Sequence, residues 1–558
     1  MARPRLSVVV LPFNKFGNGV DDDMVDAITE DLTAAITRWH DWQVTAHNTA
    51  LTYKGRPIDI RRVGEELGVR FAVTGSLRKR GTGLRVNLQL VSAETGAHLW
   101  ADHFDAGPDA DGYSVEDIIR HMALALSFWV ADAESKRIAA ESNPDAADSL
   151  TRARAALYGR PLNPENYDHV ITLLEHAADL DPHSAVAQAA LAEAQLDSIN
   201  IWTDDPETPV KLRRAEAAVR RAEILAPDER LVMGVRVTLL LMQGRCAEVI
   251  AAARRASEAH PDLSGPHLAL GICRMHEGRA AEAIPAFEQS IRVNPRNPAV
   301  YVRYHVMGYA LLFLGRYDEA VAWLQKALAA HPGDSARNRG NIHAAIAAAQ
   351  ALAGATEEAR RSAAEAAQLW PTLTARSYYP FNVSNPVAVA QIARLRDGLR
   401  LAGIRDHADV DADHNVAADA VLHSKYDSPT PPSAPGVRTI RTPELAALVQ
   451  QRQPLMLDAS NPWGQSIPAA IVLAGVGVGG STSNEPQERL RRKMHQLTGG
   501  NLDAPIVALG WNAERFQSRN LALRLAALGY TEVYWYRGGR EAWMAAGQPT
   551  AEVTVQDW

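Results

Sequence analysis

The sequence predicts a multidomain protein of the α/β plus all-α class, with a small α/β domain at each end and a helical array between them. Three observations lead to this prediction. The chain has 558 residues, which is enough for three to four domains at about 150 residues each. Strand-like β-branched runs alternate with helical patterns near both ends. Between them, prolines recur at intervals of 34 to 45 residues.

The composition excludes several classes of protein. Lys and Arg number 58 against 65 Asp and Glu, which gives a net charge of −7. Nucleic-acid-binding chains are usually basic, so no nucleic-acid partner is expected. No uncharged apolar run reaches the length of about 18 residues that a membrane helix needs, so no membrane span is expected either.

The two cysteines, Cys246 and Cys273, are too few for a disulfide framework or a Cys-rich metal module. We expect both to be small buried hydrophobic residues; a redox pair would need their Cα atoms within about 7 Å. Neither a metal nor a cofactor is expected.

Residues 1–110 are predicted to form a small α/β domain. Arg3, Arg5 and the run LSVVVLPF resemble the start of a short signal peptide, but no small-residue cleavage site follows. We therefore interpret the run as the first strand and expect the protein in the cytoplasm. The other expected elements are a helix over 21–40, a strand over 42–48, a helix over about 58–67 and a hairpin around the turn at 81–83.

Four segments of this region carry a family resemblance: VVVLPF, ITEDLTAAITR, TYKGRPIDIRRVGEELGVRFAVTGSLRKRG and RVNLQLVSAETGAHLWADHFD. Over residues 5–106 they resemble the TolB-N-terminal-like (FlgO-like) domain. In bacterial signalling proteins this module often lies between an adenylate or guanylate cyclase, or a winged-helix output domain, and a tetratricopeptide array. The resemblance implies no catalytic residue.

A connecting helix is predicted over 114–141, within a segment assigned to 111–142. Ser114 is a suitable N-cap, and Asp117 stands three residues later, as an acidic relative of the capping box. One apolar stripe follows, made of Ile118, Met122, Leu126 and Val130.

Residues 143–404 are predicted to form a helical repeat array. The recurring prolines are Pro182, Pro227, Pro261, Pro295, Pro332 and Pro371, and a glycine stands 17 residues before each of the last four. A period near 34 with an internal glycine turn resembles the tetratricopeptide repeat. The resemblance implies a concave surface that binds a protein partner. The 45-residue interval suggests an insertion at 200–209.

Residues 405–435 are acidic and end in the Pro-rich segment SPTPPSAP. This composition is typical of a linker, or of an extended segment that wraps over a neighbouring domain.

The C-terminal region, 436–558, resembles a single-domain rhodanese. The resemblance rests on Leu457-Asp458, the run 467–470, Ile506-Val507, Gly529-Tyr530, Gly538-Gly539, Trp543 and Pro549. In sulfurtransferases and related phosphatases a catalytic cysteine follows the strand that corresponds to 506–509. Here Gly510, or Asn512 if the alignment is counted back from Gly529, takes that position, and no cysteine occurs anywhere in 436–558.

Without this nucleophile, neither sulfur transfer nor cysteine-based phosphoryl transfer can proceed by the usual route, and no catalytic residue is assigned. The loop at 510–518 is a candidate site for a small anion, held by backbone N–H groups and by Asn512, Arg515, Ser518 and Arg519. The alternative is that Arg515 forms a salt bridge and the loop only caps the following helix.

Together these features predict a non-enzymatic bacterial signalling scaffold. Its array would bind a protein partner, and the rhodanese-like domain would add contacts or sense an anion. The alternatives are a residual sulfurtransferase or phosphatase in 436–558, or a small-anion sensor that uses the loop at 510–518. The combined resemblance points to an α-proteobacterial group of adenylate cyclase-like proteins, in which this arrangement follows a cyclase domain. No cyclase segment is recognised here, so a cyclase activity would be inherited from relatives rather than supported by residues.

Overall fold

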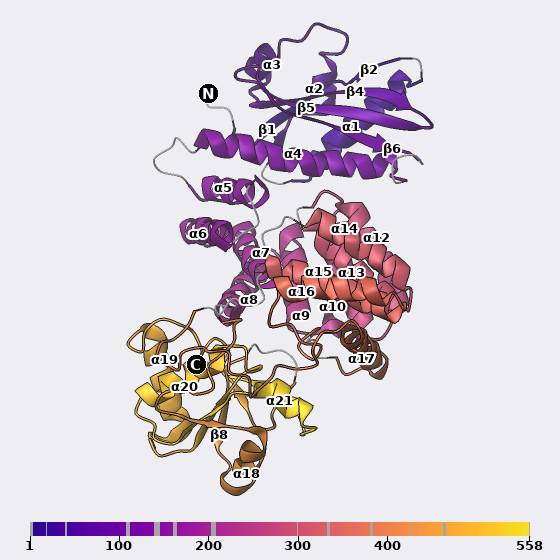
Figure 1. Cartoon of the computed structure of the whole chain (residues 1–558). Coiled ribbons are helices and arrows are strands. Elements are labelled where there is room, and N and C mark those ends of the chain that lie inside the picture. Colours follow the sequence, from indigo (N-terminus) through magenta and orange to yellow (C-terminus); the bar gives the residue numbers. More distant parts are fainter. Residues whose placement is uncertain are drawn as a thin grey trace.

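The computed structural model describes residues 4–17, 19–39, 42–107, 112–138, 145–159, 164–201, 208–297, 299–331, 335–379, 383–424, 426–460, 465–556 and 558. Figure 1 shows an α/β domain at the N-terminal end, a helical array in the middle and a second α/β domain at the C-terminal end. This is the predicted fold class.

The N-terminal domain is built on a mixed sheet with the strand order β3-β1-β4-β5-β6. Strands β1 (Ser7–Val10) and β3 (Gln43–Val44) are parallel, and β2 (Asn14–Lys15) pairs with β4. Strands β4 (Phe71–Arg80) and β5 (Gly83–Ser92) form the predicted hairpin, and β6 (His98–Ala106) extends it. The helices are α1 (Asp22–Thr37), α2 (His47–Leu51) and α3 (Ile60–Leu67). The strand expected over 42–48 is shorter than predicted, because His47 already begins α2.

Helix α4 (Val115–Ile138) corresponds to the predicted connecting helix, but it packs as part of the N-terminal domain. Its stripe, Ile118, Met122, Leu126 and Val130, is buried in the same core as the sheet. The Ser114 hydroxyl accepts the Asp117 N–H (3.1 Å), and the Asp117 carboxylate accepts the Ser114 N–H (2.9 Å). The predicted cap is therefore present.

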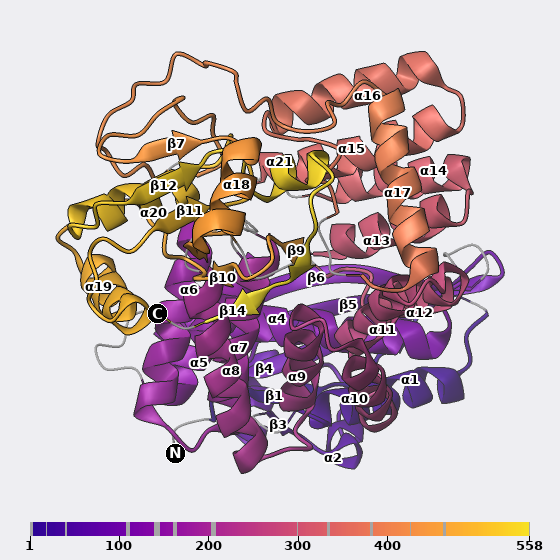
Figure 2. The same ribbon diagram turned by 90° about the horizontal axis from the view of Figure 1, so that it is seen from below.

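The array consists of antiparallel helix pairs that stack along the chain (Figure 2). Its helices are α5 (Ala146–Gly159), α6 (Pro164–Leu180), α7 (Ala185–Ile201), α8 (Thr208–Leu225), α9 (Arg230–Met242), α10 (Cys246–Ala259), α11 (Ser264–His276), α12 (Ala280–Val293), α13 (Val300–Phe313), α14 (Tyr317–Ala330), α15 (Ala336–Leu352), α16 (Thr356–Leu369) and α17 (Pro386–Leu401).

The glycines of the repeat pattern take the backbone conformation that their turns require. Gly244, Gly278, Gly315 and Gly354 have φ values of 71°, 75°, 78° and 87°, in the left-handed region that side chains other than glycine rarely adopt. These four turns between paired helices were predicted and are confirmed. Most of the insertion expected at 200–209 lies outside the described residues.

The cysteines correct a prediction. Cys246 and Cys273 are joined by a disulfide with a Cα–Cα distance of 5.3 Å, so they are not two separate hydrophobic residues. The bond links α10 to α11, which pack against each other. Disulfides are rare in cytosolic proteins, so this bond does not support the expected cytoplasmic location, which stays a prediction. Among the described helices, none is both long and apolar enough to cross a membrane.

Of the two alternatives for residues 405–435, a linker or a segment that wraps over a neighbouring domain, the structure matches the second. Of the described part, Ala408, Leu422, Thr430 and Ala434 are buried. The Thr430 N–H donates to the carbonyl of Ala513 (3.2 Å), and the Tyr426 carbonyl accepts the Phe516 N–H (3.0 Å). The segment therefore wraps over the C-terminal domain.

The C-terminal domain is built on a fully parallel sheet with the order β14-β10-β8-β11-β12-β7. Its elements are β7 (Arg438–Ile440), α18 (Thr442–Arg452), β8 (Leu455–Asp458), β9 (Gln465–Ser466), β10 (Ile471–Val472), α19 (Glu485–Thr498), β11 (Ile506–Leu509), α20 (Gln517–Ala527), β12 (Val533–Tyr536), α21 (Gly539–Ala545), β13 (Ala551–Glu552) and β14 (Thr554–Val555). The loop 510–516 leaves the carboxyl end of β11, a common position for active sites in parallel sheets.

Candidate functional site

The four residues proposed for an anion site lie in the loop after β11 (Asn512 and Arg515) and in the first turn of α20 (Ser518 and Arg519). The Asn512 amide donates to the Glu541 carboxylate (3.1 Å) and accepts the Glu514 N–H (3.0 Å). The Ser518 hydroxyl accepts a hydrogen bond from the Trp535 indole (3.0 Å). All three interactions are internal to the domain.

The two arginines of the predicted set are directed at other partners. Arg519 donates to the carbonyl oxygens of Asp419 and, at 3.1 Å, Val421. Arg515 Nε lies 3.8 Å from a carboxylate oxygen of Asp427. This matches the alternative in which Arg515 forms an ion pair. Anion binding at 510–518 stays a prediction, and the side chains expected to provide it are engaged within the protein.

Carboxylates of the same region attach the loop to the end of the array. Glu541 accepts hydrogen bonds from the Thr374 hydroxyl and from the Ala408 N–H (2.9 Å). Burial raises the pKa of Glu541 despite these bonds. Glu514 forms an ion pair with Arg405. Glu514 and Glu541 therefore attach the loop to residues Thr374, Arg405 and Ala408 at the end of the array.

A large cavity, the array cavity, lies on the inner side of the solenoid. Its volume is about 1690 Å³, and it is lined mainly by α5, α7, α9, α11, α13 and α15, the first helix of each pair. Both end domains also contribute, through residues such as Trp39 of the N-terminal domain and Trp511 and Arg515 of the C-terminal loop. Small-molecule pockets usually measure about 300–1,000 Å³, so this cavity has room for a peptide segment.

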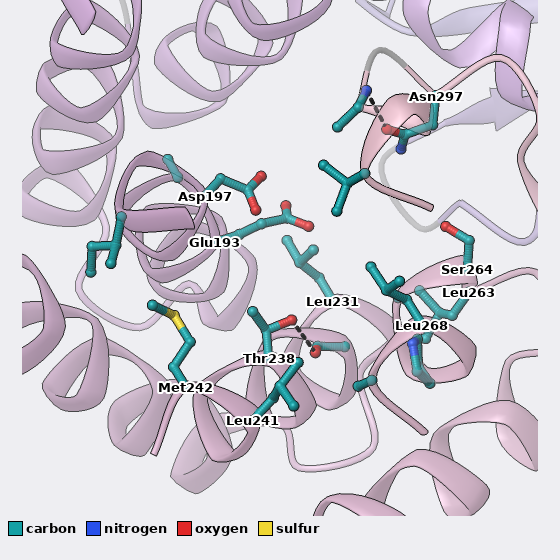
Figure 3. A pocket seen from close by; sticks show the side chains of 18 of the residues that line it. Glu193, Asp197, Leu231, Thr238, Leu241, Met242, Leu263, Ser264, Leu268 and Asn297 are labelled. Carbon is teal, nitrogen blue, oxygen red and sulfur yellow. Dashed lines mark hydrogen bonds between the residues drawn. The ribbon is translucent and has the colours of Figure 1, made fainter. Parts of the chain in front are cut away.

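Helix α7 presents two carboxylates to this cavity. Glu193 and Asp197 are four residues apart and therefore on one face of the helix. Figure 3 shows both side chains pointing from α7 into the space that Leu231 also faces. Among the described residues, neither carboxylate makes a hydrogen bond or an ion pair.

Burial and mutual repulsion make ionisation of this pair unfavourable. Burial, and next the charge of Glu193, raises the pKa of Asp197 to about 7, although Arg303 opposes the shift. Burial also raises the pKa of Glu193, against the charges of Arg230 and Arg154. Carboxylates with raised pKa values are common in functional sites.

Two of the nearby cations already have partners. Arg230 Nε lies 2.8 Å from a carboxylate oxygen of Asp262. Arg303 donates to the Ser290 hydroxyl (3.2 Å), the Ser264 hydroxyl (3.1 Å) and the Ala299 carbonyl (3.2 Å). Their charges reach the α7 pair only from a distance.

At the C-terminal end of the array cavity the charges are balanced differently. Asp427 lies between Arg337 (3.6 Å) and Arg515 (3.8 Å). Burial, and next the charge of Arg515, lowers the pKa of Arg337 to about 9. Burial opposes ionisation of Asp427, but the two arginines outweigh it and hold its pKa below the usual range. These cations face an acid of the chain itself.

The sequence analysis missed Glu193 and Asp197. Helix α7 has the sequence AVAQAALAEAQLDSINI, in which these are the only two charged residues. Two acids at i and i+4 in an Ala-rich helix are a signal that could have marked them. In the described part of the chain, no group of three or more His, Cys, Asp or Glu residues could hold a metal ion.

We expect Asp197→Asn to stabilise the protein at alkaline pH. Because the pKa of Asp197 is raised to about 7 in the folded state, its ionisation lowers the free energy of unfolding as pH rises. The charges that face the pair are Arg154 on α5, Glu229 and Arg230 beside α9, and Arg303 on α13. The gain should be on the order of 3 kcal/mol at pH 8 and fall by more than half at pH 5. Urea denaturation at both pH values measures it.

The control for this prediction is Asp179→Asn, which removes an exposed carboxylate from α6. It should change stability by less than about 0.5 kcal/mol at either pH. An equal gain at pH 5 and pH 8 for Asp197→Asn, or no gain at all, would contradict the assignment.

Comparisons with known proteins agree with two of the three regions. Two family models described as tetratricopeptide repeat match residues 235–298 and 274–339. The family model described as rhodanese-like domain matches residues 442–546. None of the three models covers half of the chain.

Among curated proteins, the chain is 33% identical over 221 residues to "Putative adenylate cyclase 3" of Rhizobium meliloti strain 1021. The match covers 39% of this chain and 37% of that relative. The chain therefore corresponds to little more than a third of the relative's length.

Three solved structures illustrate the range of structural likeness. PilF of Pseudomonas aeruginosa is 20% identical with a TM-score of 0.31, and the match covers 41% of this chain and 93% of PilF. The tetratricopeptide protein TTC0263 of Thermus thermophilus is 20% identical with a TM-score of 0.27, covering 34% and 93%. TolB of Acinetobacter baumannii is 15% identical with a TM-score of 0.17, covering 22% and 28%.

The likeness to TolB is partial, and the finer assignment of the N-terminal domain stays a prediction. The family matches and the geometry support the rest of the architecture. The chain carries a tetratricopeptide array followed by a rhodanese-like domain.

Proposed function

We propose that this chain is a non-enzymatic bacterial signalling scaffold that binds a protein partner in the array cavity. The observation that carries the proposal is the cavity of about 1690 Å³, lined by the first helix of each pair and by both end domains. Solenoids of this type use such concave surfaces for binding. The link to signalling is supported by the relative described as a putative adenylate cyclase, but it rests on a match to 37% of that protein.

The rhodanese-like domain serves in this proposal as an accessory binding module. No cysteine occurs in 436–558, and the side chains of the candidate anion loop already bond to other parts of the protein. These facts favour the scaffold over a residual sulfurtransferase, a phosphatase or a small-anion sensor.

The experiment compares capture of proteins from lysate of the source cell by the full chain and by Leu231→Gln/Leu268→Gln. Both leucines line the cavity and are only partly buried, so the fold should tolerate the change. We expect at least one protein that the full chain retains and the double variant loses by tenfold or more.

The matched control is Leu180→Gln/Leu401→Gln, because these leucines are 49% and 63% exposed and lie outside the cavity. This control should retain the same partner as the unmodified chain. Loss of the partner in the control, or a set of retained proteins that does not depend on the cavity leucines, would overturn the proposal.

A further inference from the structure

The array cavity has an uneven distribution of charge, and this distribution constrains the partner. At one end, Arg337 and Arg515 both lie near Asp427, so the cations there already face a carboxylate of the chain. At the α7 end, Glu193 and Asp197 have no hydrogen-bond or ion-pair partner among the described residues. The two α7 carboxylates are therefore acidic groups of the cavity wall that a positively charged group of a ligand could pair with.

The α7 carboxylates are also partly enclosed. Both side chains are half-buried, and both line the cavity. A partly buried carboxylate without a hydrogen-bond partner is costly. The charges of Arg154, Arg230 and Arg303 act on the pair, but Arg230 is paired with Asp262 (2.8 Å) and Arg303 bonds to two serines and a carbonyl. A ligand that brings its own positive charge removes this cost.

The walls around the pair define the rest of the ligand. Leu231, Leu241, Met242 and Leu268 project into the same space (Figure 3). Long basic side chains suit such a site, because their methylene stems pack on apolar surface while the charged head reaches a carboxylate. The volume of the cavity exceeds what a single small molecule fills, which favours a peptide segment as the carrier of the charge.

We propose that the array cavity receives an extended peptide segment of the partner that places a Lys or Arg side chain between Glu193 and Asp197. This inference rests on the proposed function and specifies the chemistry of the partner. The basic head group pairs with the two carboxylates, and flanking apolar side chains of the peptide pack on the leucines. Since the pair must ionise to bind a cation, binding releases protons and tightens as pH rises from 6 to 8.

The test uses the full chain and three oriented libraries of fluorescent nonapeptides, with a fixed central Lys, Gln or Glu and random flanking positions. Fluorescence anisotropy at pH 6, 7 and 8 measures binding. We expect the Lys library to bind at least tenfold more tightly than the Gln and Glu libraries. Glu193→Gln/Asp197→Asn should remove this preference and the pH dependence.

The matched control is Glu357→Gln/Glu358→Gln, which likewise removes two negative charges, but from the exposed face of α16. It should keep the full preference for Lys. Equal binding of the Lys library to both double variants overturns the inference, as does a preference for Glu, binding of none of the libraries, or binding of free spermidine in place of the peptides.

A second measurement separates this inference from the scaffold function. Glu193→Gln/Asp197→Asn is used in the capture experiment described above. If the partner that depends on the cavity leucines is retained unchanged by this variant, the basic-residue inference fails and the scaffold proposal stands. If no partner depends on the cavity leucines, the scaffold proposal itself fails.

Discussion

The Gly271→Ala variant should lose about 3 kcal/mol of stability, which lies at the upper end for overpacked cores. Gly271 lies in α11, where an added Cβ would stand 2.3 Å from Cε1 and 2.6 Å from Cδ1 of Phe287. Phe287 is fully buried in the largest core of the array, so its ring has little room to move away. The two helices of the pair must separate instead. Urea denaturation followed by circular dichroism measures the loss.

Gly234→Ala provides the matched control. Gly234 lies within α9, the corresponding first helix of the preceding pair, and an added Cβ would meet only Leu263, at 3.7 Å. Because alanine is a better helix former than glycine, this variant should gain up to about 1 kcal/mol. A second variant, Gly271→Ala/Phe287→Leu, should recover part of the lost stability. If Gly271→Ala were as stable as Gly234→Ala, the close packing of α11 on α12 would be wrong.

The Arg540→Met variant should destabilise the C-terminal domain by about 3–5 kcal/mol. Arg540 Nε lies 2.6 Å from Asp458, and both side chains are at most 1% exposed. The Asp458 carboxylate also accepts the Ser466 hydroxyl (2.6 Å) and the Ser460 N–H (2.9 Å). Removing the arginine leaves a buried carboxylate without its cation, and this uncompensated charge accounts for most of the cost.

Arg452→Met is the control for the buried pair. Arg452 forms an ion pair of similar length with Glu532 (2.6 Å), but both side chains are exposed, at 45% and 35%. Exposed pairs contribute about 0–1 kcal/mol, so the change should be small. Asp458→Asn combined with Arg540→Met should recover part of the stability, because the buried charge is then absent. Equal losses for Arg540→Met and Arg452→Met would refute the reasoning.

Much of the fold could be predicted because local patterns encode it. The glycine spacing located the turns between paired helices, since each of these glycines has a positive φ. The apolar stripe of α4 was also visible in the sequence. What covers the stripe was not: periodicity shows that one face is buried but does not identify its partner, and α4 proved to pack on the N-terminal sheet.

The candidate site was less predictable, because it depends on contacts between residues far apart in the sequence. The four candidate residues in the loop after β11 and the first turn of α20 were located by family resemblance, but their bonds to Asp419, Val421 and Glu541 depend on how the chain returns over the domain. The pairing of Cys246 with Cys273 required knowing that α10 packs on α11. Glu193 and Asp197 become a candidate binding site only because they line the array cavity, and the sequence does not show that cavity.

The shared lining of the array cavity has a further consequence for the whole chain. Trp39 and Trp511 both line it although 472 positions separate them in the sequence. If a bound segment gains affinity by contacting both end domains, then by thermodynamic reciprocity its binding stabilises the arrangement of these two domains by the same free energy. A segment bound in the array cavity would therefore hold the two end domains together. A destabilising substitution in either end domain should weaken binding of the partner. A bound partner should in turn slow proteolysis of both end domains.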